Sequence, residues 1–114
     1  MTGNGAHAKP LKILVTGGEG KLARALCALD SSIAAPSRRE LDVTSWDSIR
    51  DYCQGKSIGV IVHAAAVTNK FREDADERYI RTNIIGTANV VLWCMQHKIR
   101  LVYISSDYVY PSER

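Results

Sequence analysis

A glycine-rich turn joins an apolar stretch to an amphipathic stretch near the start of this chain. The apolar residues of 11–15 end at Thr16, glycine then dominates positions 17–20, and from Lys21 onward leucine and alanine recur at helical spacing. This order predicts a strand at 11–16, a tight turn, and a helix that ends near Leu29. Glycine adopts positive φ at little cost and lets a bound group approach the backbone. The segment is therefore suited to bind an anion at the helix N-terminus, and a turn without a ligand is the alternative.

Further apolar segments alternate with helical patterns along the rest of the chain. Strands are predicted at 33–36, 58–63 and 101–105, with a short additional one at 41–43, and helices at 45–54 and 74–96. Strands that alternate with helices are typical of a parallel sheet with right-handed crossovers. We predict an α/β, Rossmann-type fold with helices on both faces of a parallel sheet that stops after its fourth main strand. One domain would span 10–114, behind a flexible tail at 1–9.

Local residues also predict where the helices begin, end and pack. Thr44 is expected to cap the helix at 45–54, with Asp47 completing a variant of the capping box, and Gly55 suits its C-terminal end. Gly86 lies inside the long helical pattern, where glycine costs about 1 kcal/mol relative to alanine. We therefore expect close approach of the backbone or a ligand at Gly86. The first helix should bury one apolar face, made of Leu22, Ala25, Leu26 and Leu29.

Charge and cysteine usage argue against several classes of partner. The net charge is only +3, and basic residues are interspersed with acidic ones, which is unlike a nucleic-acid-binding surface. Cys27, Cys53 and Cys94 have no metal-binding spacing and fit reduced thiols in or near the core. No apolar run approaches the ~18 residues of a membrane span. We predict a cytoplasmic protein without nucleic-acid or membrane partners.

Distinctive residues follow the predicted strands. In a parallel sheet, ligands bind outside the carboxyl ends of the strands, so these segments should meet at one edge. Their convergence predicts a dinucleotide site there, although the alanines among them also suit packing under a helix. The segments are 17–20, 37–38, 42, 64–68 and 105–108.

Five segments, in this order, resemble the extended short-chain dehydrogenase/reductase superfamily, and most closely its dTDP-4-dehydrorhamnose reductase branch. They read ILVTGGEGKLA, ELDVTSWDSI, VIVHAAAVTN, YIRTNIIGTANVV and LVYISSDYVY, and they span nearly all of the chain after Lys9. The family pattern TGxxGxxG is met except at Ala23, which stands in the place of its last glycine. That position serves helix–strand packing, so alanine weakens the match only slightly.

The resemblance implies cofactor-binding roles for residues at this edge. Asp42 and Val43 would meet the adenine ring. Asn83 would lie near the cofactor and the catalytic loop, and its alternative is an ordinary buried amide bonded to the backbone. The pyrophosphate would be held by the backbone of the turn, at Gly17, Gly18, Gly20, Lys21 and Leu22.

The resemblance also implies residues for the nicotinamide and the substrate. Ala64, Ala65 and Ala66 would line the ribose and nicotinamide. Ser106 matches the catalytic serine, whose hydroxyl hydrogen-bonds the carbonyl being reduced, and Asp107 and Tyr108 would lie beside the substrate, a nucleotide sugar. Without the resemblance, this cluster is only a polar strand end.

The residues after the predicted second strand bear on the choice of cofactor. An acidic side chain there binds the ribose 2′-hydroxyl of NAD, whereas this chain has Ser37, Arg38 and Arg39. Since a guanidinium binds phosphate through paired hydrogen bonds, we predict a preference for NADP(H), with NAD(H) possible and Arg38 as the ligand. Two solvated surface charges are the alternative.

The superfamily's proton donor is the tyrosine of a YxxxK pair that follows the catalytic serine, and no such pair follows Ser106 here. We therefore expect the N-terminal part of a longer reductase, inactive or very weakly active alone. A homo-oligomer is one option for the intact protein. A non-catalytic NADP-binding regulatory subunit is a second hypothesis. An epimerase or dehydratase is a third, disfavoured by the short connection at 37–40.

Overall fold

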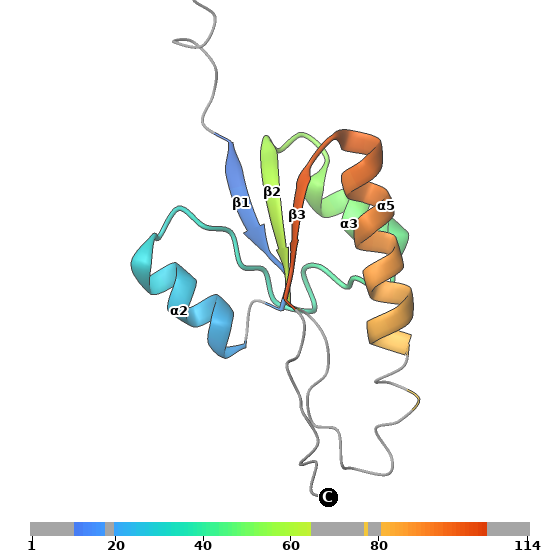
Figure 1. Ribbon diagram of the computed structural model, residues 1–114, viewed down its shortest axis with the longest axis horizontal. Helices are drawn as coiled ribbons and strands as arrows, with labels where there is room; N and C mark the ends of the chain where they lie inside the picture. The colour runs from blue at the N-terminus through green and yellow to red at the C-terminus, as the bar shows by residue number, and fades with distance from the viewer. Residues whose placement is uncertain (1–10, 18–19, 65–76, 78–80, 105–114) are drawn as a thin grey trace, which may run out of the picture.

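A three-stranded parallel sheet forms the centre of the computed structural model, which describes residues 11–17, 20–64, 77 and 81–104 (Figure 1). The strands are β1 (Lys12–Val15), β2 (Ile58–His63) and β3 (Arg100–Tyr103), in the order β1-β2-β3. Leu14 pairs with Ile61, and Val62 pairs with Val102. The central strand β2 is mostly apolar, as expected for a strand covered on both faces.

Helices cover both faces of this sheet. They are α2 (Lys21–Leu29), α3 (Trp46–Cys53), the π-helix η2 (Arg81–Gly86) and α5 (Thr87–His97), which continues directly from η2. Figure 1 shows α2 on one side of the sheet and α3 with α5 on the other. The predicted Rossmann-type α/β fold is confirmed. The predicted tail at 1–9 lies outside the described residues.

The segment predicted as the second strand contributes only one bridge. Ala34 pairs in parallel with Leu14, its N–H donates to the carbonyl of Ile13 (2.9 Å), and its carbonyl accepts from the N–H of Val15 (2.8 Å). Pro36 has no N–H to continue a ladder, and the chain turns directly after it. The sheet therefore extends by a single residue beyond β1.

The short strand expected at 41–43 is not formed. The N–H of Leu41 donates to the carbonyl of Ser37 (2.9 Å), and the Asp42 carboxylate accepts from the N–H (3.0 Å) and the hydroxyl (2.7 Å) of Thr44. Such local side-chain bonds compete with strand pairing. The prediction of Thr44 as the helix cap was wrong as well, since its hydroxyl donates to Asp42 and α3 begins one residue later than predicted.

Ser45 caps α3 instead, since its hydroxyl accepts from the N–H of Ser48 (3.2 Å). Asp47 does not complete a capping box but pairs with Arg50 at 3.0 Å. Gly55 follows the C-terminal end of α3 with φ of 81°, which confirms its predicted role.

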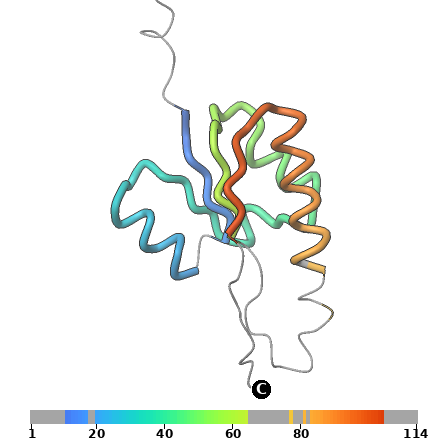
Figure 2. The backbone as a smooth tube through the Cα atoms, in the orientation of Figure 1, coloured from blue at the N-terminus to red at the C-terminus, as the bar shows by residue number. Residues whose placement is uncertain are grey.

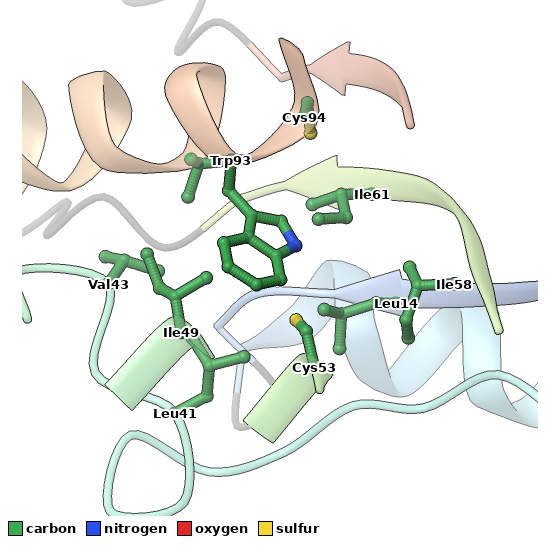
Figure 3. Packing of buried hydrophobic residues seen from close by; sticks show 10 residues of the cluster. Leu14, Leu41, Val43, Ile49, Cys53, Ile58, Ile61, Trp93 and Cys94 are labelled. Atoms are coloured by element: carbon green, nitrogen blue, oxygen red, sulfur yellow. The ribbon is translucent and has the colours of Figure 1, made fainter. Parts of the chain in front are cut away.

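The core lies between the sheet and the helices α3 and α5 (Figure 3). Ile49 of α3, Trp93 of α5, and Leu14 and Ile61 of the sheet are its centre, and each is at most 6% exposed. The predicted apolar face of α2 is much less buried. The one buried residue of α2 is Ala23, which was not part of that face. Of the predicted face, Leu26 is half-buried, Leu22 and Ala25 are exposed, and Leu29 is 84% exposed. The pattern predicted the helix correctly but not how deeply it packs.

All three cysteines are free thiols, as predicted, with Cys53 and Cys94 buried and Cys27 half-buried. Burial raises the pKa of the Cys53 and Cys94 thiols from 9.0 to about 11. No cluster of metal-binding side chains occurs among the described residues, and none of the helices described there is long and apolar enough to cross a membrane.

These thiols should therefore differ in reactivity. At about pH 8, a disulfide reagent is expected to modify Cys27 quickly, and Cys53 and Cys94 only as fast as the protein opens, because the thiolate is the reactive form. Cys27→Ser should abolish the fast phase, and fast modification of two thiols would contradict the buried positions.

The stability of the protein should also depend on pH through these two buried thiols. Since Cys53 and Cys94 ionise near 9.0 in the unfolded chain and near 11 in the native protein, the free energy of unfolding should fall as the pH rises through this range.

Candidate functional site

The carboxyl ends of the three strands meet at one edge of the sheet (Figure 2). Thr16, Ala64 and Ile104 are the residues that follow β1, β2 and β3 there. The N–H of Thr16 donates to the carbonyl of Val62 (3.0 Å), and the N–H of Ile104 donates to the carbonyl of His63 (3.2 Å). Helix α2 begins at this same edge (Figure 1).

The glycine turn has the geometry that the sequence predicts. Gly17 has φ of 74°, and its carbonyl accepts from the N–H of Gly20 at 2.9 Å. Gly20 is the N-cap of α2 and supplies no side-chain cap. A Cβ on Gly20 would lie 3.3 Å from the carbonyl oxygen of Gly17. The turn is thus tight, and Lys21 and Leu22 are exposed in the first turn of the helix.

The residues predicted for the adenine side have different environments. Asp42 is half-buried and holds Thr44, while Val43 is 4% exposed and belongs to the core. The carbonyl of Val43 accepts from the side-chain amide of Asn89 (2.9 Å). Asp42 and Val43 therefore fix the entry to α3 and its contact with α5, whatever they contribute to binding.

Arg38 is exposed in the turn that follows the Ala34 bridge. The adjacent Glu40 carboxylate accepts from the N–H of Ser37 at 2.8 Å, so it is used to close this turn. Within the described part of the chain, no ion pair or hydrogen bond engages the Arg38 guanidinium. That guanidinium is therefore available to an anionic group.

Asn83 lies in the π-helix η2, which the sequence reasoning did not foresee. Its side chain is half-buried and makes no hydrogen bond to the described residues. π-helical turns are frequent at functional sites. The alternative was that the Asn83 side-chain amide bonds to the backbone. Within 11–17, 20–64, 77 and 81–104, no backbone group forms that hydrogen bond.

Several predicted site residues are not among those that the structure describes. They are Gly18, Ala65, Ala66, Ser106, Asp107 and Tyr108. Ala64 is described, and its N–H donates to the hydroxyl of Thr16 at 2.8 Å.

A chain of hydrogen bonds that the sequence reasoning missed links Thr16, His63 and Thr87. The two ring nitrogens of His63 lie 2.9 Å from the Thr16 hydroxyl and 3.0 Å from the Thr87 hydroxyl. The His63 side chain is 2% exposed, and burial lowers its pKa. The signal in the sequence was a histidine that ends a buried strand directly before the alanines.

One tyrosine with lysine four residues on was also overlooked, Tyr52 with Lys56. The Lys56 ammonium lies 4.2 Å from the centre of the Tyr52 ring and donates to the Tyr52 carbonyl. Both residues precede β2, at the end of the sheet opposite the glycine turn. Burial, and then Glu40 and Cys53, raise the pKa of Tyr52, whereas a proton-donating tyrosine needs a lowered pKa. This pair is structural.

The model of a family described as RmlD substrate binding domain matches residues 11–114. The chain belongs to the RmlD family. The resemblance to dTDP-4-dehydrorhamnose reductases and related sugar-nucleotide reductases is thereby confirmed.

Relatives of this RmlD-family chain carry names of the same kind. A dTDP-4-keto-6-deoxy-D-glucose reductase from Streptomyces niveus is 34% identical over 102 residues, which cover 85% of this chain and 35% of that protein. A GDP-L-fucose synthase from Azorhizobium caulinodans is 30% identical over 111 residues, which cover 91% of this chain and 36% of that protein. The chain thus spans about a third of the length of the curated relatives it matches.

A solved structure shares the fold. The dTDP-4-dehydrorhamnose reductase of Bacillus anthracis in complex with NADP has a TM-score of 0.80 and 28% identity, covering 94% of this chain and 40% of that one.

A cavity of about 560 Å³ lies at the opposite end of the sheet, between α3 and α5. Trp46, Lys56, Trp93 and His97 are among the residues that line it, and none of the predicted site residues does. The cavity and the glycine turn are therefore separate features of the molecule.

Proposed function

We propose that this chain supplies the cofactor site of an NADPH-dependent reductase that acts on a 4-keto nucleotide sugar. The observation that carries the proposal is the tight turn between Gly17 and Gly20, which starts a helix at the carboxyl edge of a Rossmann-type sheet. Support also comes from the relatives, which are named as sugar-nucleotide reductases, and from the NADP complex of the Bacillus anthracis reductase. We further expect a cytoplasmic protein whose partner is a small molecule.

The residues of the turn fit a pyrophosphate. Gly20 has no Cβ, so as the N-cap it offers no side-chain acceptor of its own to the first N–H groups of α2. A helix N-terminus carries about half a unit of positive charge, which favours a bound phosphate. The exposed Arg38 would then pair with the 2′-phosphate that distinguishes NADP(H) from NAD(H).

The nicotinamide supplies a hydride when the cofactor is bound. In the proposal, the Ser106 hydroxyl donates a hydrogen bond to the oxygen of the substrate ketone, which stabilises the charge that develops there. Asp107 and Tyr108 lie beside the sugar in this scheme. Asn83 would orient groups between the cofactor and this loop.

A non-catalytic NADP-binding subunit is the second candidate, because the glycine turn and the exposed Arg38 bear on cofactor binding and not on turnover. The two candidates share the cofactor site and differ only in turnover. The short turn at 37–40, which leads to α3 without a further strand, favours both over an epimerase or dehydratase.

Separate measurements of cofactor binding and of turnover distinguish the reductase from the non-catalytic subunit. NADPH fluorescence should change on titration with the chain, and we expect little or no oxidation of NADPH when a dTDP-4-keto-6-deoxy sugar is added. The same assay on a natural gene product that continues past these residues should show oxidation if the protein is a reductase. Binding without oxidation in that longer protein would favour the regulatory subunit, and absence of NADPH binding in both would refute the proposal.

A further inference from the structure

His63 joins three elements at the edge where the cofactor is proposed to bind. Its Nδ1 lies 2.9 Å from the Thr16 hydroxyl, at the end of β1, and its Nε2 lies 3.0 Å from the Thr87 hydroxyl, in the first turn of α5. The ring of Tyr103, in β3, stacks on the imidazole with ring centres 5.9 Å apart. The imidazole is therefore held by neighbours from β1, α5 and β3.

The hydrogen bonds around Thr16 determine where the imidazole carries its proton. The Thr16 hydroxyl oxygen already accepts from the N–H of Ala64 at 2.8 Å. The oxygen could also accept from a protonated Nδ1, but its own hydrogen would then have only the Val62 carbonyl at 3.5 Å. Donation from the hydroxyl to Nδ1 at 2.9 Å makes the better hydrogen bond. Nδ1 is then an acceptor, so the proton of the neutral ring lies on Nε2 and is donated to Thr87.

We propose that His63 is a positioning residue of the cofactor site, whose neutral, Nε2-protonated imidazole fixes the Thr16 hydroxyl, and with it the entry to the glycine turn, to helix α5 through Thr87. The role in cofactor binding rests on the proposed function, whereas the protonation pattern does not. With the ring neutral and Nδ1 unprotonated, each bond in this chain of hydrogen bonds is 3.0 Å or shorter.

Protonation of His63 would reverse its hydrogen bond with Thr16 and place a charge on a buried ring. A hydrogen on Nδ1 would face the Thr16 hydroxyl hydrogen, which would have to turn to the Val62 carbonyl at 3.5 Å. Of the described side chains in contact with the ring, Thr16 and Thr87 do not titrate in the acid range, and the Tyr103 phenol is the one titratable group. No described acidic side chain compensates a charge on the imidazole.

Burial lowers the pKa of His63 below 6.5, so the unfolded chain takes up this proton first as the pH falls. The stability that the neutral ring contributes is complete above about pH 6.5 and is lost as the pH falls toward the lowered pKa. Affinity for NADPH should decline over the same range, because the Thr16 hydroxyl, next to the glycine turn, no longer donates its hydrogen bond to His63.

The first test needs no cofactor. Long-range ¹H–¹⁵N correlation spectra of the ¹⁵N-labelled chain at neutral pH distinguish a protonated from an unprotonated ring nitrogen. We expect His63 to have its hydrogen on Nε2 and none on Nδ1. A hydrogen on Nδ1, or a charged ring at neutral pH, would overturn the proposal even if NADPH binds well.

The second test compares the pH dependence of NADPH binding in matched variants. His63→Gln keeps a polar group near the Thr87 side but does not titrate, and it should weaken binding at neutral pH by about fivefold, as for one lost hydrogen bond. It should also reduce the acid decline seen in the parent chain. His97→Gln is the control, since His97 is exposed and stacks on Trp93 far from the turn, and it should leave the profile unchanged.

Thr87→Val and Thr87→Ser test the hydrogen bond between His63 Nε2 and the Thr87 hydroxyl. Valine has the shape of threonine without its hydroxyl and should shift the acid decline, whereas serine retains the hydroxyl and should restore the parent profile. Circular dichroism at each pH confirms that the variants are folded. An acid decline that persists unchanged in His63→Gln would refute the positioning role.

Discussion

Replacing Gly86 with alanine is expected to lower the free energy of unfolding by up to about 2 kcal/mol, because overpacking a core costs about 1–3 kcal/mol and the helix propensity of alanine offsets about 1 kcal/mol of it. A Cβ built on Gly86 lies 2.6 Å from Cγ2 of Val43, which is 4% exposed. Val43 is β-branched and therefore stiff, so the contact is relieved only by moving the backbone. Gly86 has helical φ and ψ of −62° and −45°, so alanine should gain about 1 kcal/mol from helix propensity, which the clash outweighs. Chemical denaturation of both proteins measures the difference.

A double-mutant cycle and a matched glycine test the reason. Gly86→Ala combined with Val43→Ala should be less destabilised than the sum of the two single changes, because the shortened side chain makes room. Gly59→Ala is the comparison, since its Cβ would meet both Cβ and Cδ1 of Leu11 at 2.6 Å. Leu11 is 68% exposed, so its displacement disturbs the core less than that of Val43, and a smaller loss is expected. If Gly86→Ala stabilises the protein, α5 does not approach Val43 as described.

Arg38→Ala is expected to weaken NADPH binding by about 10- to 100-fold while leaving NADH binding nearly unchanged. A hydrogen bond to a charged group contributes about 1.5–3 kcal/mol, and each 1.4 kcal/mol corresponds to a factor of ten in affinity. The Arg38 guanidinium is exposed and pairs with no described side chain, so removing it leaves no buried charge behind. Fluorescence titration with both cofactors measures the effect.

Two neighbouring substitutions separate a specific contact from a general charge effect. Arg39→Ala removes the same charge one residue away and should cost less than Arg38→Ala. Arg38→Lys keeps the charge but loses the paired hydrogen bonds, so we expect an intermediate affinity. Equal losses for NADPH and NADH in Arg38→Ala, or equal effects at Arg38 and Arg39, would show that the 2′-phosphate is not bound there.

The buried strands and the first helix could be predicted because their signals are local. β2 runs from Ile58 to His63 as predicted, and α2 begins at Lys21 and ends at Leu29 as its glycine and leucine pattern indicates. The close approach at Gly86 was also predicted, since a glycine inside a helical pattern needs a packing reason. These features depend on residues near one another in the sequence.

The features that could not be predicted depend on competing or distant contacts. The strand predicted at 33–36 forms only one bridge, because Pro36 and the turn at 37–40 end the hydrogen-bond ladder. Ser45 caps α3 in place of Thr44, because its hydroxyl is the one that accepts from the N–H of Ser48. The contact between Thr16 and His63 joins residues 47 positions apart, which no local pattern reveals.

The proposed cofactor site itself combines both kinds of feature. The glycine turn could be predicted from the spacing of its glycines. The hydrogen bond between Thr16 and His63 and the π-helix around Asn83 could not. A π-helical turn such as η2 does not produce a simple hydrophobic periodicity in the sequence. Nor does the sequence distinguish a buried histidine that only packs in the core from one that positions a neighbouring side chain.

Backbone amide chemical shifts of the ¹⁵N-labelled chain, followed during titration with NADPH, test the central claim most directly. We predict saturable shifts at the carboxyl edge of the sheet, in Gly17, Gly20, Arg38 and Ala64, with little change at Trp46, Lys56 and His97, which line the cavity at the opposite end. Shifts confined to that cavity, or no saturable shifts at the glycine turn, would contradict the assignment of the cofactor site.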